Sequence, residues 1–125
     1  MVASNAVSIA QAYFRPEAWF RAIYADETPV GFVVLYDSHL GTQPPQQDYY
    51  EVWRFMIGAR YQGKGFGCRA MELVIAHVKT RPNAKRLYLG HRREPGNAGD
   101  FYQKFGFAYT GHEEEGGDVE MCLVL

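Results

Sequence analysis

Apolar residues gather in short blocks along this chain, separated by polar or glycine-containing segments. Trp19 to Ala25 and Val30 to Tyr36 are rich in aromatic and β-branched residues, which favour strands. The second block is nearly all apolar, which predicts burial on both faces. Turn residues at 26–29 join the two blocks and predict an antiparallel hairpin. A third strand is expected at Tyr49 to Ile57, after a polar loop with two prolines at 41–48.

The apolar spacing changes in the second half of the chain. Four apolar residues recur at helical spacing and predict a helix that ends before Arg81 and Pro82: Met71, Val74, Ile75 and Val78. Lys85 to His91 is predicted as a strand. A short helix is expected to start at Asn97, with Asp100 in a variant capping box, and to stop at Gly106.

The chain is predicted to end in two strands, Phe107 to Thr110 and Val119 to Leu125, around an acidic turn. The full order is strand, strand, strand, helix, strand, helix, strand, strand. This order predicts an α/β fold with a mixed central sheet flanked by helices. The length of 125 residues predicts a single domain, residues 1–125.

Composition and charge exclude several classes of function. A net charge of −1 gives no electrostatic reason to expect a nucleic-acid partner. Neither the two cysteines nor the four histidines have the spacing of a metal site, so no metal is expected. The sequence has no apolar run long enough to span a membrane and no signal peptide at 1–11, which predicts a cytoplasmic protein without a membrane partner.

The segment from Gln62 to Gly67 lies between a predicted strand and a predicted helix and carries three glycines in five positions. Glycines let a backbone approach a ligand closely, and the free N–H groups of a helix start favour an anion. The alternative is a tight turn without a ligand. Cys68 and Arg69 follow the last glycine, which excludes a P-loop, and the spacing also differs from a dinucleotide fingerprint.

Two motifs resemble the GNAT acyltransferase superfamily. Gln62-x-x-Gly65-x-Gly67 is similar to its Q/R-x-x-G-x-G/A signature, and the segment 101–107 (FYQKFGF) looks like its FYxKxGF box. The stretch 53–65 resembles a narrower branch, the bacterial spermine/spermidine and diamine acetyltransferases. The resemblance implies an acyl-CoA-binding domain that transfers an acetyl group from acetyl-CoA to a primary amine of a small polyamine or diamine, within a ternary complex.

The resemblance also implies which residues hold acetyl-CoA. Phe55, Met56 and Ile57 would run beside the pantetheine arm as an added strand would, and a backbone N–H near Met56 and Ile57 would polarise the carbonyl. The phosphates would lie against the loop residues Gln62, Gly63, Lys64, Gly65, Phe66, Gly67 and Cys68. Two residues on or beside the second helix, Asn97 and Lys104, complete the predicted contacts. Lys64, Arg69 and the basic residues at 91–93 can add positive charge at the phosphates, or can be solvated surface residues.

Two features depart from the family pattern. The family normally opens with a strand and a helix that precede the part with which this chain starts. Many members also carry a CoA-contacting Asn seven residues before the tyrosine of the box, whereas that position here is Pro95 and the nearest asparagine is Asn97.

Two residues are candidates for the proton transfers. Tyr102 is the expected general acid for the departing thiolate, because the phenol and thiol pKa values are close enough for a well-placed tyrosine. Glu51 is the candidate base, and strand alternation is expected to place it on one face with Trp53 and Phe55. An exposed strand carboxylate is the alternative for Glu51. The acidic residues at 113–120 can form a wall that recruits a polycation, or can be a solvated turn.

The same residues are also compatible with other functions. The acceptor can be another amine, such as an antibiotic, an amino acid or a protein N-terminus, and the domain can be a non-catalytic CoA-binding module. Without the family's first strand, the strand at Trp19 to Ala25 has an open edge, which predicts a homodimer through the N-terminal region.

Overall fold

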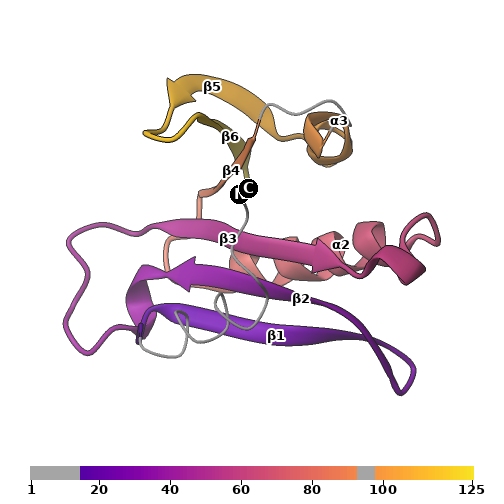
Figure 1. The fold of residues 1–125 in the computed structure, drawn as a ribbon. Coiled ribbons are helices and arrows are strands. Elements are labelled where there is room, and N and C mark those ends of the chain that lie inside the picture. Colours follow the sequence, from indigo (N-terminus) through magenta and orange to yellow (C-terminus); the bar gives the residue numbers. More distant parts are fainter. Residues whose placement is uncertain (1–14, 93–97) are drawn as a thin grey trace.

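The computed structural model describes residues 15–92 and 98–125, whose strands form one mixed sheet in the order β1-β2-β3-β4-β6-β5 (Figure 1). The strands are β1 (Ala18–Ala25), β2 (Thr28–Asp37), β3 (Tyr50–Ile57), β4 (Arg86–Arg92), β5 (Ala108–Glu113) and β6 (Asp118–Val124). The helices are α2 (Phe66–Lys79), α3 (Ala98–Gln103) and the short 3₁₀ turns η1 (Ser38–Leu40) and η2 (Ala59–Tyr61). The predicted fold class and order of elements are therefore confirmed. The expected start of the second helix at Asn97 lies outside the described residues.

One face of the sheet carries the hydrophobic core. Helix α2 covers this face and contributes Met71, Val74 and Val78, each at most 4% exposed. The sheet supplies alternate residues of four strands to the same core: Val33, Leu35, Tyr50, Val52, Leu87, Leu89, Met121 and Leu123. Phe101, Tyr102 and Phe105 pack against this cluster, so α3 and the turn that follows it lie on the core face as well.

The two halves of the sheet meet at only two residue pairs. Strands β3 and β4 run parallel and pair at Glu51–Tyr88 and Val52–Leu89, after which they separate. Figure 1 shows β1–β2–β3 and β4–β6–β5 diverging from this contact. Among the described residues no strand pairs with the β4-facing edge of β3 beyond Val52, and we call the unpaired stretch between the two halves the slot.

Polar contacts hold the closed end of this slot. Asp37 is 1% exposed at the end of β2, and its carboxylate accepts hydrogen bonds from Arg81 Nε at 2.6 Å and from the backbone N–H of His39 at 2.9 Å. The Tyr50 hydroxyl donates to the Pro82 carbonyl at 2.6 Å. Both contacts join the β2–β3 region to the turn between α2 and β4, which positions β4 beside β3.

An extra residue in β3 changes which side chains face the core. Val34 pairs with Arg54 and Leu35 pairs with Val52, so Trp53 has no partner on β2 and forms a bulge. Phe55 consequently packs against the core, whereas Glu51 and Trp53 line a pocket on the opposite face. The prediction that Phe55 shares a face with Glu51 and Trp53 is wrong, because strand alternation does not continue through a bulge.

Gly31 allows β2 to approach the far end of β3. A Cβ atom at this position would collide with the carbonyl oxygen of Met56. The neighbouring Ile57 is the last residue of β3, so this close approach holds the strand where it borders the slot. No helix within the described ranges 15–92 and 98–125 is long and apolar enough to cross a membrane.

We expect Gly31→Ala to destabilise the fold by about 1–3 kcal/mol or more, because the new methyl group must displace the β3 backbone. Gly90→Ala is the matched control, since the atoms nearest to its added Cβ lie at 3.7 Å, an ordinary contact distance. Denaturant unfolding of both variants measures the difference. Equal stabilities of the two variants would contradict the close approach of β2 to β3.

Candidate active site

The start of α2 presents backbone N–H groups that have no hydrogen-bond partner among residues 15–92 and 98–125, at the open end of the slot. Gly63 and Gly65 have φ angles of 76° and 86°, a conformation that favours glycine, and a Cβ at either position would meet no atom within 4 Å. The first backbone hydrogen bond of the helix is Arg69 N–H to the Gly65 carbonyl at 3.1 Å. The N–H groups of the preceding residues 66–68 have no such bond, and no side chain of the described chain caps the helix.

The loop is tied to the end of β3 and to α3. The Gln62 side-chain amide donates to the Ile57 carbonyl at 2.9 Å, which fixes the loop against the strand. Gly67 packs so that an added Cβ would lie 3.5 Å from the Phe101 ring and 3.6 Å from Ile57. The helix start is therefore open, free of acidic side chains in its first turn and suited to a phosphate group.

Tyr102 lies on the core face beside β4. Its ring centroid is 5.3 Å from that of Phe101, 6.0 Å from Phe107 and 6.1 Å from His91. Burial raises the pKa of the Tyr102 phenol above its ordinary value, so the hydroxyl keeps its proton at neutral pH. This is the protonation state that a proton donor needs.

Glu51 lies at the closed end of the slot, on the face opposite α2. The Tyr49 hydroxyl donates to Glu51 Oε2 at 2.9 Å, and the Tyr49 ring stacks on Tyr88 with centroids 5.1 Å apart. Burial raises the pKa of Glu51; the Tyr49 hydrogen bond opposes the rise, and the charges of Glu114 and Glu120 add to it. A carboxylate with a raised pKa is a stronger proton acceptor than an ordinary glutamate.

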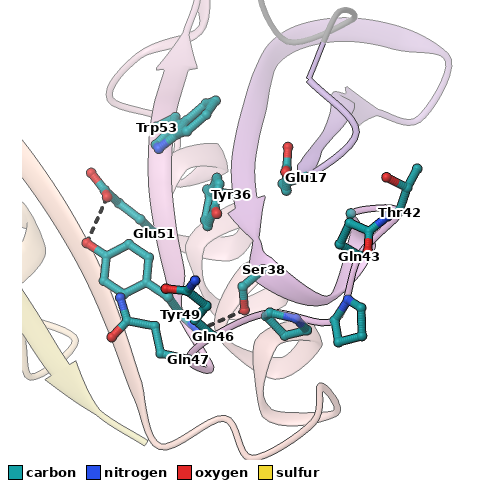
Figure 2. A pocket seen from close by; sticks show the side chains of 13 residues that line it. Glu17, Tyr36, Ser38, Thr42, Gln43, Gln46, Gln47, Tyr49, Glu51 and Trp53 are labelled. Carbon is teal, nitrogen blue, oxygen red and sulfur yellow. Dashed lines mark hydrogen bonds between the residues drawn. The ribbon is translucent and has the colours of Figure 1, made fainter.

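A pocket of about 470 Å³ opens beside Glu51 on the same face (Figure 2). Its lining combines the aromatic side chains Tyr36, Tyr49 and Trp53 with the carboxylates Glu17 and Glu51, and residues 41–47 of the β2–β3 loop close one side. Ser38 shapes its base, because its hydroxyl accepts a hydrogen bond from the Tyr49 N–H at 2.9 Å. Aromatic rings next to carboxylates form a suitable environment for a cation.

The remaining predicted residues are distributed around these features. Met56 pairs with Phe32 on the pocket face, and Phe66 and Cys68 are half-buried at the start of α2. Lys64 and Lys104 are exposed. Arg92 Nε lies 3.8 Å from Asp118 Oδ1. Arg93, Pro95 and Asn97 lie outside the described residues. No group of three or more potential metal-ligating side chains in 15–92 and 98–125 could hold a metal ion.

Comparison with known proteins identifies the family of this chain. The model of the acetyltransferase (GNAT) family matches residues 4–107. The chain belongs to this family. A curated relative, the spermine/spermidine N(1)-acetyltransferase of Bacillus subtilis strain 168, is 38% identical over 76 residues, which cover 59% of this chain and 50% of the relative. This GNAT chain thus spans about half the length of the curated relatives it matches.

Solved structures share the fold of this GNAT chain. A GNAT acetyltransferase from Elizabethkingia anophelis with acetyl-CoA bound superposes with a TM-score of 0.74 at 19% identity, covering 98% of this chain and 84% of that one. The PaiA N-acetyltransferase of Thermoplasma acidophilum in complex with coenzyme A gives a TM-score of 0.66 at 21% identity, covering 97% of this chain and 68% of that one. At these identities the likeness establishes the fold alone.

Several pocket residues could not be found by sequence reasoning. The sequence places Glu17 and Tyr36 near the ends of separate strands, and only the pairing of β1, β2 and β3 brings them beside Glu51. The sequence could have indicated Tyr49, because it lies two residues before Glu51 in the same predicted strand. The pattern of apolar residues does not indicate the bulge at Trp53.

We expect Glu51→Gln to raise the thermal stability at neutral pH, by roughly a few degrees. The raised pKa of Glu51 means that the folded chain favours the protonated carboxyl, so ionisation of this group destabilises the fold as pH rises through its folded pKa. Below about pH 4 both side chains are uncharged and the difference should vanish. Thermal unfolding near pH 7.5 and at acidic pH measures it, with the exposed Glu27→Gln as control. A lower melting temperature of Glu51→Gln near pH 7.5 would contradict the raised pKa.

Proposed function

We propose that this domain transfers the acetyl group of acetyl-CoA to a primary amine of a small diamine or polyamine. The observation that carries the proposal is the slot between β3 and β4, which has an anion-suited helix start at its open end and a carboxylate at its closed end. The family match and the curated spermine/spermidine relative support the same activity.

A long thioester would lie along the slot, with its phosphates at one end. Extended edges such as that of β3 from Trp53 to Ile57 accept an added strand-like chain through backbone hydrogen bonds. The N–H groups at residues 66–68 would hold the diphosphate, and Gln62 would keep the loop in place through its bond to Ile57. An N–H of β3 near Met56 would stabilise the charge that develops on the thioester oxygen.

The proposed proton donor and the proposed proton acceptor lie on opposite faces of the sheet. Glu51 faces the pocket and would take a proton from the incoming ammonium group, which frees the amine lone pair for attack. Tyr102 packs on the core face with α3 and would protonate the departing thiolate. The carbonyl carbon of the acetyl thioester would lie between Glu51 and Tyr102. The new C–N bond would then form on one side of the slot, and the C–S bond would break on the other.

Acidic side chains around Glu51 support a cationic acceptor. The charges of Glu114 and Glu120 add to the rise in the pKa of Glu51 that burial causes, and the Thr110 hydroxyl donates a hydrogen bond of 2.8 Å to Glu120 Oε1. The acidic wall anticipated at 113–120 would therefore add to the attraction of Glu51 for a polycation.

The homodimer and the cytoplasmic location stay predictions. Phe20 and Tyr24 of β1 are 37% and 60% exposed, and no described strand pairs with the outer edge of β1. These features are compatible with the expected dimer contact near the N-terminal region.

Coenzyme A is expected to stabilise the folded chain through the loop at 62–67. At a hundredfold excess over its dissociation constant, a ligand of the native state adds about 2.7 kcal/mol. Gly65→Ala should abolish this gain by moving the loop amides. Gly116→Ala is the matched control, since both positions have a positive φ and open space around an added Cβ. Thermal unfolding with and without coenzyme A measures the gain, and no gain in the wild type would refute the phosphate site.

Tyr102→Phe is expected to lower kcat for acetylation of spermidine by about 10²- to 10⁴-fold, the usual contribution of general acid catalysis. Stabilisation by coenzyme A should stay unchanged, because only the transition state uses the hydroxyl. Steady-state thiol release measures kcat, with the exposed Tyr24→Phe as control. An unchanged kcat would assign the proton to another group.

The same assay with a panel of acceptors tests the substrate class. Faster turnover of amino acids or aminoglycosides than of spermidine would remove the polyamine assignment. Coenzyme A binding without turnover of any amine would leave a binding module.

A further inference from the structure

The pocket extends across three neighbouring strands from one carboxylate to another. Tyr36 of β2 pairs with Ala18 of β1 on one side and with Glu51 of β3 on the other, and Glu17 immediately precedes Ala18. In Figure 2, Tyr36 accordingly lies between Glu17 and Glu51. Two strand spacings separate the backbones of the two glutamates, roughly 10 Å. This separation suits a ligand with two positive charges joined by a short alkyl chain.

The chain itself places a cation at the Glu17 end of the pocket. The guanidinium carbon of Arg15 lies 5.5 Å from the centroid of the Trp53 ring, and Arg15 Nε lies 3.7 Å from Glu17 Oε2. The Trp53 ring also tilts against Tyr36, with centroids 5.1 Å apart. An aromatic face and a carboxylate thus already hold a positive group together, which is the environment that ammonium ligands prefer.

One oxygen of the Glu17 carboxylate lacks a hydrogen-bond donor among the described residues. Its Oε2 atom is buried and has no hydrogen-bond partner among residues 15–92 and 98–125, since Arg15 stands beyond hydrogen-bond distance. A buried acceptor without a donor is unfavourable, so a ligand N–H that takes the place of the Arg15 guanidinium would satisfy it. Arg15 is itself exposed and can leave the site without disturbing the core.

We propose that Glu17, Tyr36 and Trp53 form a subsite for the second, non-reacting ammonium group of the acceptor, and that Arg15 occupies this subsite until the acceptor displaces it. The proposal rests on the proposed acetyl transfer, in which Glu51 receives the reacting end. Its consequence is specificity: a diamine contacts both ends of the pocket, whereas a monoamine of equal length contacts only one.

The first experiment compares 1,4-diaminobutane with butylamine, which has the same alkyl chain but a single amine. Loss of the ring in Trp53→Leu or of the charge in Glu17→Gln should lower the ratio of kcat/KM values, diamine over monoamine, by about 3- to 30-fold. Tyr24→Leu and Glu27→Gln remove an exposed ring and an exposed carboxylate outside the pocket, and should leave the ratio unchanged. An unchanged ratio in both pocket variants, with turnover intact, would overturn the subsite and keep the acetyl transfer.

The second experiment measures the binding of a cation without catalysis. Tetramethylammonium carries a positive charge but cannot be acetylated, and it should quench the fluorescence of Trp53. The response should persist in Trp19→Phe, whose ring stacks on His77 on the core side, and disappear in Trp53→Leu. Arg15→Gln should tighten binding severalfold by removing the competing guanidinium. Weaker or unchanged binding in Arg15→Gln would refute the competition. Binding that depends on Trp53 and Glu17, without turnover of any amine, would support the cation subsite and refute the acetyl transfer.

Discussion

The parallel contact between β3 and β4 is the constraint on which the rest of this structure depends. It spans two residue pairs, and the polar contacts of Asp37 with Arg81 and of Tyr50 with Pro82 hold it in place. Beyond the contact β3 and β4 do not pair, while each stays paired with its other neighbour, β2 or β6. The open edge of β3, the position of the α2 start and the approach of α3 all follow from this arrangement.

The bulge at Trp53 divides the chemistry between the two faces of the sheet. Without the extra residue, the side chain at position 55 would face the pocket with Glu51, and the core would lose the contact between Phe55 and Phe101, whose ring centroids lie 6.1 Å apart. With it, an apolar wall supports α3 on one face while carboxylates and aromatic rings line the other. A single inserted residue therefore gives β3 an apolar face toward the core and a face with carboxylates toward the pocket.

The elements and the glycine loop could be predicted from the sequence because their signals are local. The apolar spacing of Met71, Val74 and Val78 identifies α2, and the glycines at 63 and 65 mark the turn before it. The bulge and the pocket could not be predicted in the same way. Glu17 is more than thirty positions from Glu51 in the chain, and its role arises only from the register of three strands.

Strand pairing joins β3 and β4 at one end of the slot and not at the other. Ile57 lies five positions after Val52, roughly 17 Å along an extended strand. If one half of the sheet rotated about the Glu51–Tyr88 contact, Ile57 and its attached loop would move further than Glu51, because they lie further from the contact. In the proposed reaction, adjustment to the length and thickness of the thioester would thus fall on the glycine loop. The carboxylate proposed to accept the proton lies at the pivot, where such movement is smallest.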